Sequence, residues 1–169
     1  MKKIVILILL ACLCACQRTK PQAPSNRYHK TDTLGVGMVL LNQRLAEEAD
    51  IQLRKYVKGN NLNDLNNLQL TETGVWYQQE MTKTARLKKN DVVTLKYTIS
   101  TLRDSLLLDN VQSVTVGRRE TIAAIDDMLY ELGRGEKVVM FVPWHQAYGA
   151  TGNKYVPAYT NIKIELEVQ

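Results

Sequence analysis

The segment of residues 147–152 reads Ala-Tyr-Gly-Ala-Thr-Gly and joins two stretches, residues 136–142 and 161–168, in which apolar and polar side chains alternate. Alternation with a period of two predicts β-strands, so this segment is a loop between two strands of a sheet. A tyrosine among small residues in such a loop can line an apolar cavity with its ring while its hydroxyl donates a hydrogen bond to a carbonyl group. The alternative is a glycine-rich hairpin loop with one aromatic ring packed beneath it.

Much of the preceding chain also predicts strands. A long strand is expected over residues 91–102, short strands over 106–109 and 113–116, and one or two strands around a turn within 68–79. Residues 121–132 carry apolar side chains at helical spacing and predict a helix. Together these elements give an antiparallel sheet of about five strands crossed by one helix, which is the α+β class.

A longer helix is predicted ahead of the sheet, within a section of helix and linker that covers residues 35–70. Gly59 and the two asparagines after it are typical of a helix end, and residues 60–70 are expected to be irregular. A single apolar stripe must pack on something, either the helix's own domain or a partner, and the sequence leaves both open. The stripe consists of Met38, Leu41, Leu45, Ala49, Leu53, Tyr56 and Val57.

The first residues have the pattern of a secretion signal. A positive start with Lys2 and Lys3 precedes an apolar run over residues 4–13, which is too short to span a bilayer but has the length of a signal-peptide core. The sequence then turns polar, and residues 16–34 contain little apolar pattern. We therefore expect a signal peptide over residues 1–15, followed by a flexible tether.

The end of the apolar run, Leu13-Cys14-Ala15-Cys16, resembles a bacterial lipobox. The resemblance implies cleavage before Cys16, acylation of this residue and anchoring in a membrane by several acyl chains. Two alternatives remain: lipidation at Cys12, and ordinary secretion in which the cysteines are lost with the signal peptide.

Composition excludes several other kinds of protein. All three cysteines lie in the first sixteen residues, so the folded body can hold neither a disulfide nor a thiolate metal site. A formal charge of +5, of which two units belong to the leader, gives no reason to expect a nucleic-acid partner. No cofactor or metal is expected: His29 and His145 lack carboxylates at ligand spacing, and His145 is interpreted as a surface-loop residue. Trp144 either packs over the loop or stands exposed as a substrate contact.

Residues 71–169 resemble an FKBP-type peptidyl-prolyl cis-trans isomerase domain, with the order and spacing of the matching segments kept almost without gaps. These segments are residues 74–77, 91–98, 104–109, 116–122, 132–137, 147–152, 155–157 and 162–166. The resemblance implies a half-barrel sheet wrapped round one helix, an apolar pocket between them, and proline-containing polypeptides as partners. The lipobox, the N-terminal helix and Gly-Val-Trp-Tyr at residues 74–77 further resemble the gliding-motility-associated lipoprotein isomerases of Bacteroidetes.

The resemblance also implies roles for particular residues. The Tyr148 hydroxyl and the Ile122 backbone N–H would donate to substrate carbonyls, Asp109 would anchor the polar rim, and Ile125 would form the pocket floor. On the residues alone, Asp109 could instead cap a strand end, and Tyr97 could be a core tyrosine bonded to Asp109. The full predicted set is Tyr97, Leu108, Asp109, Glu120, Thr121, Ile122, Ile125, Ala147, Tyr148, Val156 and Ile164.

The chain departs from the family at the pocket floor. The family usually has large aromatic residues at the positions of Leu108 and Ile125, and often at that of Ile164, whereas all three are aliphatic here. Two functions are therefore kept. The first is a lipid-anchored isomerase that helps extracytoplasmic proteins to fold, and the second is a catalytically weak or inactive binding or chaperone module of a cell-envelope assembly. The expected location is the periplasmic side of the outer membrane, with the cell surface as the alternative.

Overall fold

The computed structural model describes residues 33–60, 68–79 and 84–169 of the chain. The chain divides into two units, Met1–Val36 and Gly37–Gln169, and the candidate site lies within the second. The predicted signal peptide, Cys16 and almost all of the predicted tether lie outside the described residues. The last two residues of that tether already belong to a helix, α2 (Thr33–Gly59).

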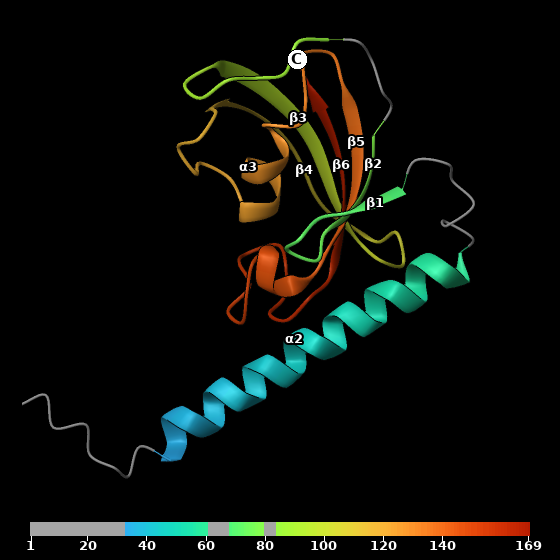
Figure 1. The fold of residues 1–169 in the computed structure, drawn as a ribbon, viewed down its shortest axis with the longest axis vertical. Coiled ribbons are helices and arrows are strands. Elements are labelled where there is room, and N and C mark those ends of the chain that lie inside the picture. Colours follow the sequence, from blue (N-terminus) through green and yellow to red (C-terminus); the bar gives the residue numbers. More distant parts are fainter. Residues whose placement is uncertain (1–32, 61–67, 80–83) are drawn as a thin grey trace, which may run out of the picture. The chain divides into compact units, whose positions relative to one another are not determined.

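The described residues form one sheet of six antiparallel strands, which are arranged in the order β1-β2-β5-β6-β3-β4 (Figure 1). This confirms the α+β class, for which the sequence predicts a sheet of about five strands. Both arms of the hairpin at residues 68–79 pair, and β1 begins inside the stretch expected to be irregular. The strands are β1 (Leu68–Leu70), β2 (Trp76–Gln79), β3 (Val92–Thr101), β4 (Leu106–Thr115), β5 (Lys137–Val142) and β6 (Ile162–Val168).

The core lies between the sheet and a short helix, α3 (Ala123–Met128), which packs against one face of the curved sheet (Figure 1). Alternation along β3 produces that face, because Val93, Leu95, Tyr97 and Ile99 are buried while the residues between them are exposed or half-buried. We call the face that carries these four residues the inner face of the sheet and the other its outer face.

The region of residues 106–116 forms one ten-residue strand and not the two short strands predicted. Its polar centre, around Asn110, does not interrupt the ladder, because β4 pairs with β3 on both sides of that residue. A register shift occurs only near the hairpin turn, between Ile99 and Ser100. Long-range pairing therefore holds in strand conformation a segment whose own sequence predicts a break.

The predicted helix over residues 121–132 is also shorter than expected, because α3 has six residues and ends at Met128. Backbone bonds from Tyr130 to Asp127 and from Glu131 to Met128 then turn the chain with three-residue spacing. Leu129 and Leu132 remain fully buried in this turn. Their burial explains why the apolar pattern continues beyond the helix.

The second half of α2 packs on its own domain, which decides between the two possibilities left open for its apolar stripe. Ala49, Leu53 and Val57 are buried, and the Tyr56 ring lies 5.6 Å from the Phe141 ring of β5. The large apolar side chains nearer the start of the helix are exposed: Val36, Met38, Val39, Leu40 and Leu41. Within the part of the chain that is described, no helix is both long and apolar enough to cross a membrane.

Candidate functional site

The loop from β5 to β6 presents Tyr148 and is held by a series of backbone hydrogen bonds. It begins with a single 3₁₀ turn, η3 (Trp144–Gln146), whose Trp144 carbonyl accepts the N–H of Gly149 at 2.9 Å. The Gly152 N–H then donates to the Tyr148 carbonyl at 3.1 Å, and the Tyr159 N–H donates to the Gly149 carbonyl at 3.1 Å. The backbone on both sides of Tyr148 is therefore fixed by the folded shape of the loop.

Two features of the structure at residue 152 favour glycine over any residue with a side chain. Its φ of +65° lies in the left-handed region, which costs free energy for residues with a side chain. A Cβ atom at this position would also lie 2.5 Å from the Val156 carbonyl oxygen and 2.6 Å from the Ala158 nitrogen. The two arms of the loop therefore meet at a point that leaves no room for a methyl group.

The Tyr148 ring is half-buried and packs against the core cluster that contains Tyr97 of β3. Burial raises the pKa of Tyr148, the neighbouring Tyr97 raises it further, and a hydrogen bond with the Asn153 side chain lowers it in part. The raised pKa leaves the phenol protonated at neutral pH, as an ordinary tyrosine also is, so its hydroxyl can donate a hydrogen bond. Donation to a substrate carbonyl stays a prediction.

Beside Tyr148 the inner face is aliphatic. Leu108, Ile99 and Ile164 lie in register across β4, β3 and β6, and Ile164 is fully buried. Val156 of the loop and Ile125 of α3 are also fully buried in the same core cluster. The partly buried residues at the edge of this cluster include Leu108, Ile122, Ala147 and Tyr148. The structure thus brings together the eight apolar and tyrosine members of the predicted set.

The Ile122 backbone is placed as a donor. It has extended dihedral angles, φ −69° and ψ 154°, immediately before α3, and its carbonyl accepts the N–H groups of Ile125 and Asp126. Its own N–H has no acceptor among the described residues, so it is free to bind a ligand carbonyl. The prediction that this amide donates to substrate is compatible with that placement.

The three remaining members of the set do not join the cluster. The exposed Glu120 carboxylate accepts the Thr115 N–H at 2.9 Å and so closes the turn after β4. The Thr121 hydroxyl donates to the buried Asp126 carboxylate at 2.6 Å. Asp109 is exposed and lies opposite Thr98, on the outer face of the sheet.

The polar partner of Tyr97 is Asn110, which the sequence interpretation missed. The Asn110 side-chain amide donates to the Tyr97 hydroxyl at 2.9 Å, and the two residues lie directly opposite each other in the β3–β4 ladder. The pairing of Tyr97 with Asp109 considered from the sequence is therefore corrected by one position. Asn153, the partner of Tyr148, was missed as well, although it follows the glycine-rich segment by one residue.

A separate hollow of about 440 Å³ lies on the outer face of the sheet. Its lining includes Lys96 and Thr98 of β3, Val139 of β5, and Glu165 and Glu167 of β6, all of which alternate with inner-face residues. It is open and carries charges of both signs, so it is not the predicted apolar pocket. No group of three or more histidine, cysteine or acidic side chains in the described part of the chain could hold a metal ion.

The structure decides the environment of two residues of η3. Trp144 is buried, so of the two possibilities left open by the sequence it packs and does not stand exposed. His145 is half-buried, and its Nε2 lies 3.5 Å from a carboxylate oxygen of Asp50 in α2. The histidine therefore has a carboxylate neighbour, ninety-five positions away in the sequence, where local spacing predicted none.

The family model of the FKBP-type peptidyl-prolyl cis-trans isomerases matches residues 83–169, just over half of the chain. The chain belongs to this family. The match contains the whole of the sheet from β3 onward, α3 and the loop that carries Tyr148, so the family's isomerase activity is assigned to this FKBP domain. No curated protein matches the chain.

Solved structures share the fold of this FKBP protein. The crystal structure of FkpA from Escherichia coli has a TM-score of 0.58 and 16% identity, and the match covers 99% of this chain and 80% of FkpA. A peptidyl-prolyl cis-trans isomerase from Pseudomonas syringae pv. tomato has a TM-score of 0.57 and 20% identity, with 73% of this chain and 92% of that one covered. At these identities the likeness concerns the fold.

Substitutions can test that Asn110 lies on the inner face of the sheet, bonded to Tyr97, and that Asp109 lies on the outer face. Asn110→Ala removes the donor to the Tyr97 hydroxyl inside the sheet and is expected to lower the free energy of unfolding by about 0.5–1.5 kcal/mol. Asp109→Ala changes an exposed outer-face residue and is expected to stay within about 0.5 kcal/mol of the parent. Urea unfolding of both variants measures the difference, and a larger loss for Asp109→Ala would contradict the assignment.

Proposed function

We propose that this FKBP-type isomerase is a lipid-anchored protein of the cell envelope that accelerates cis–trans isomerisation of X–Pro bonds in extracytoplasmic polypeptides. The observation that carries the isomerase part of the proposal is the half-buried Tyr148 side chain at the edge of an apolar cluster that includes Leu108, Ile122 and Ala147. An apolar surface suits a prolyl ring, and a neutral donor beside it suits the carbonyl of a peptide group.

The chemistry needs little more than such a surface. Resonance makes the C–N bond resist rotation, with a barrier of about 18–20 kcal/mol, and gives the planar amide a large charge separation. The twisted transition state has lost much of this charge separation, so an apolar environment disfavours the planar ground state more than the transition state. Donors such as the Tyr148 hydroxyl and the Ile122 N–H then hold the neighbouring carbonyls while the bond rotates.

A protease-coupled assay with proline peptides, varied at the residue before proline, tests this function. Uncatalysed isomerisation takes tens to hundreds of seconds, so acceleration by micromolar protein is readily resolved. We expect faster conversion of the cis peptide, with a preference for apolar residues before proline. Absence of any acceleration, together with retained peptide binding, would reject the isomerase function.

The role of Tyr148 as a donor gives a sharper prediction. Tyr148→Phe keeps the ring in the cluster and removes only the hydroxyl, so peptide binding is expected to weaken by about 0.5–1.5 kcal/mol while the melting temperature stays nearly unchanged. Calorimetric titration and thermal unfolding measure the two quantities. Equal affinity and equal activity in the variant would mean that this hydroxyl does not bind the substrate.

A second candidate is a binding or chaperone module of an envelope assembly with weak or no isomerase activity. The aliphatic lining favours it, since Leu108, Ile125 and Ile164 offer no aromatic ring on which proline could stack. The protease-coupled assay separates the two candidates, because a binding module would take up proline peptides without changing the rate of their isomerisation.

The envelope location rests on the sequence of the leader and on its likeness to the gliding-motility-associated lipoproteins of Bacteroidetes. We propose that Cys16 is acylated and that the domain faces the periplasm from the outer membrane. Cys16→Ser is then expected to move the protein from the membrane fraction to the soluble fraction and to abolish labelling with a fatty-acid probe. Labelling that persists in Cys16→Ser but disappears in Cys12→Ser would assign the lipid to Cys12.

A further inference from the structure

We propose that α2 is a positioning element of the isomerase site and not only a spacer between the domain and the N-terminal part of the chain. Its residues 42–52 contact the beginning and the end of the loop that presents Tyr148. The inference rests on the proposed role of Tyr148, but concerns residues outside the segment that the family model matches.

The beginning of the loop is attached to α2 through Trp144. Its indole N–H donates to the Leu45 carbonyl at 3.2 Å, and its buried ring lies 4.8 Å from the Tyr159 ring near the end of the same loop. The Tyr159 hydroxyl in turn lies 3.4 Å from the Asn42 side-chain oxygen. Trp144 therefore links α2 to both arms of the loop.

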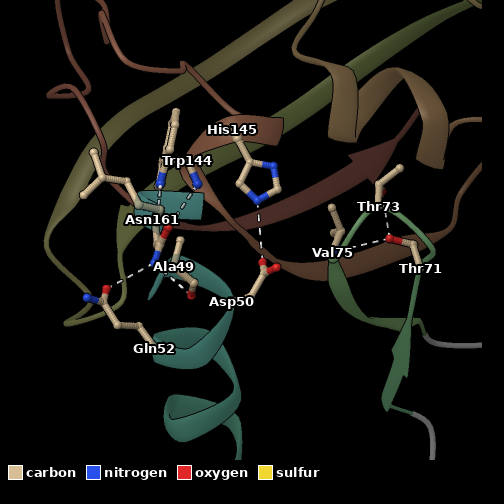
Figure 2. A network of polar contacts seen from close by, with 10 residues as sticks. Ala49, Asp50, Gln52, Thr71, Thr73, Val75, Trp144, His145 and Asn161 are labelled. Atoms are coloured by element: carbon tan, nitrogen blue, oxygen red, sulfur yellow. Dashed lines mark hydrogen bonds and ion pairs between the residues drawn. The ribbon is translucent and has the colours of Figure 1, made fainter. Parts of the chain in front are cut away.

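The end of the loop is attached through Asn161, a buried polar residue directly before β6 (Figure 2). Its side-chain oxygen accepts the Trp144 backbone N–H at 3.0 Å, which closes the loop on itself. Its side-chain nitrogen points to α2, at 3.5 Å from the Ala49 carbonyl and 3.4 Å from the Gln52 side-chain oxygen. One amide group thus ties the two ends of the loop to each other and to the helix.

The third attachment joins His145 to Asp50 (Figure 2). The facing atoms, Nε2 of the histidine and one carboxylate oxygen, are 3.5 Å apart, are shielded from solvent, and have no hydrogen-bond partner among the described residues. His145 precedes Tyr148 by three residues, so this contact restrains the same turn that begins the loop.

These attachments matter for catalysis because the donor belongs to a loop and the apolar floor does not. The floor residues Ile125 and Ile164 belong to α3 and β6, and none of the three attachments to α2 starts from a residue within these two elements. Tyr148 reaches its place through the loop, and displacing a substrate-positioning group by about 1 Å can cost up to about a hundredfold in rate. Loss of the α2 attachments should therefore move the donor relative to the floor.

Asn161→Asp is the most direct test. An aspartate keeps the acceptor for the Trp144 N–H but loses the amide that points to α2, so the loop stays closed while its attachment to the helix is broken. We expect kcat/KM for a proline peptide to fall by roughly tenfold. Trp144→Phe, which keeps a ring but loses the indole N–H, is expected to lower it by a smaller factor.

Amide hydrogen exchange measured by NMR supplies a readout that does not depend on activity. The Gly149 and Tyr159 amides, whose bonds hold the loop, are expected to exchange at least several-fold faster in Asn161→Asp, while the strand amides of β3 keep their protection. If Asn161→Asp only destabilised the whole domain, the melting temperature would fall and the loop amides and the β3 amides would lose their protection from exchange together. That outcome would overturn the proposal. Unchanged loop exchange and unchanged kcat/KM would overturn the proposal.

Asn90→Asp provides a matched control, since it makes the same chemical change at an exposed turn residue far along the chain from the loop. It is expected to leave kcat/KM and loop exchange as in the parent, and an equal fall in this variant would overturn the proposal by showing that added charge alone is responsible. If the parent protein itself fails to accelerate isomerisation, the proposed function fails, and loop exchange in Asn161→Asp still decides whether α2 positions the loop.

Discussion

Gly152→Ala is expected to lower kcat/KM by roughly tenfold to a hundredfold, because the methyl group cannot be placed without moving the loop that carries Tyr148. The substitution puts a side chain at a φ of +65° and brings its Cβ to 2.5 Å from the Val156 carbonyl oxygen. The atoms that the Cβ would meet, the Val156 carbonyl oxygen and the Ala158 nitrogen, are backbone atoms, so the backbone of the loop must shift. The protease-coupled assay measures the loss, and circular dichroism checks that the variant is folded.

Gly149→Ala is the matched control for this prediction. Gly149 also has a positive φ, of +70°, but a Cβ there would meet no atom within 4 Å. The two variants therefore share the cost of a left-handed alanine, about 1–2 kcal/mol, and differ in the close approach. We expect Gly149→Ala to retain most of its activity. Equal losses in the two variants would assign the effect to backbone strain instead of to contact between the two arms of the loop.

Leu53→Ala is expected to lower the free energy of unfolding by about 2–5 kcal/mol, the range for a fully buried leucine. Leu53 is 0% exposed although it belongs to α2, outside the segment matched by the family model. A loss of this size requires that α2 unfolds together with the sheet, since a helix that was only a spacer would contribute almost nothing. Urea unfolding followed by circular dichroism and by tryptophan fluorescence measures it, and the two signals should change together.

Leu41→Ala gives the comparison on the same helix. Leu41 is 48% exposed, so its replacement is expected to change the free energy of unfolding by no more than about 0.5 kcal/mol. Both variants exchange leucine for alanine within α2, so their effects on helix propensity are nearly the same. Similar losses for Leu53→Ala and Leu41→Ala would mean that α2 is not part of the cooperative domain.

The sequence predicts well those elements whose pattern repeats locally. The alternation along β3 and the apolar spacing of α2 reflect which side chains are buried, and both elements are present. Elsewhere the pattern of buried residues does not match the secondary structure. Leu129 and Leu132 keep a helical spacing because both are buried, although α3 has already ended. The polar centre of β4 suggests a break that pairing with β3 prevents.

The candidate site follows the same division. Tyr148 is recognisable from the local pattern of its loop, whereas the apolar residues around it follow from the resemblance to the FKBP family. The partner of Tyr97 depends on the register of a hairpin, which local sequence does not determine. Adjacent residues of a strand face opposite sides, so Leu108 lies on the inner face and Asp109 on the outer face, and a shift of one residue would exchange Asp109 for Asn110. The contact of His145 with Asp50 joins distant parts of the chain and has no local signal.

The position of β4 gives Asp109 a different importance from the one first predicted. β4 is the last strand of the sheet, and among the described strands nothing pairs with its free side. A ten-residue edge with exposed Leu106 and Val111 is a template on which a second copy of the chain could assemble. Asp109 is the one charged residue in this strand. An exposed acid at an unpaired strand opposes edge-to-edge pairing with a second copy, so Asp109 is expected to favour solubility at high protein concentration.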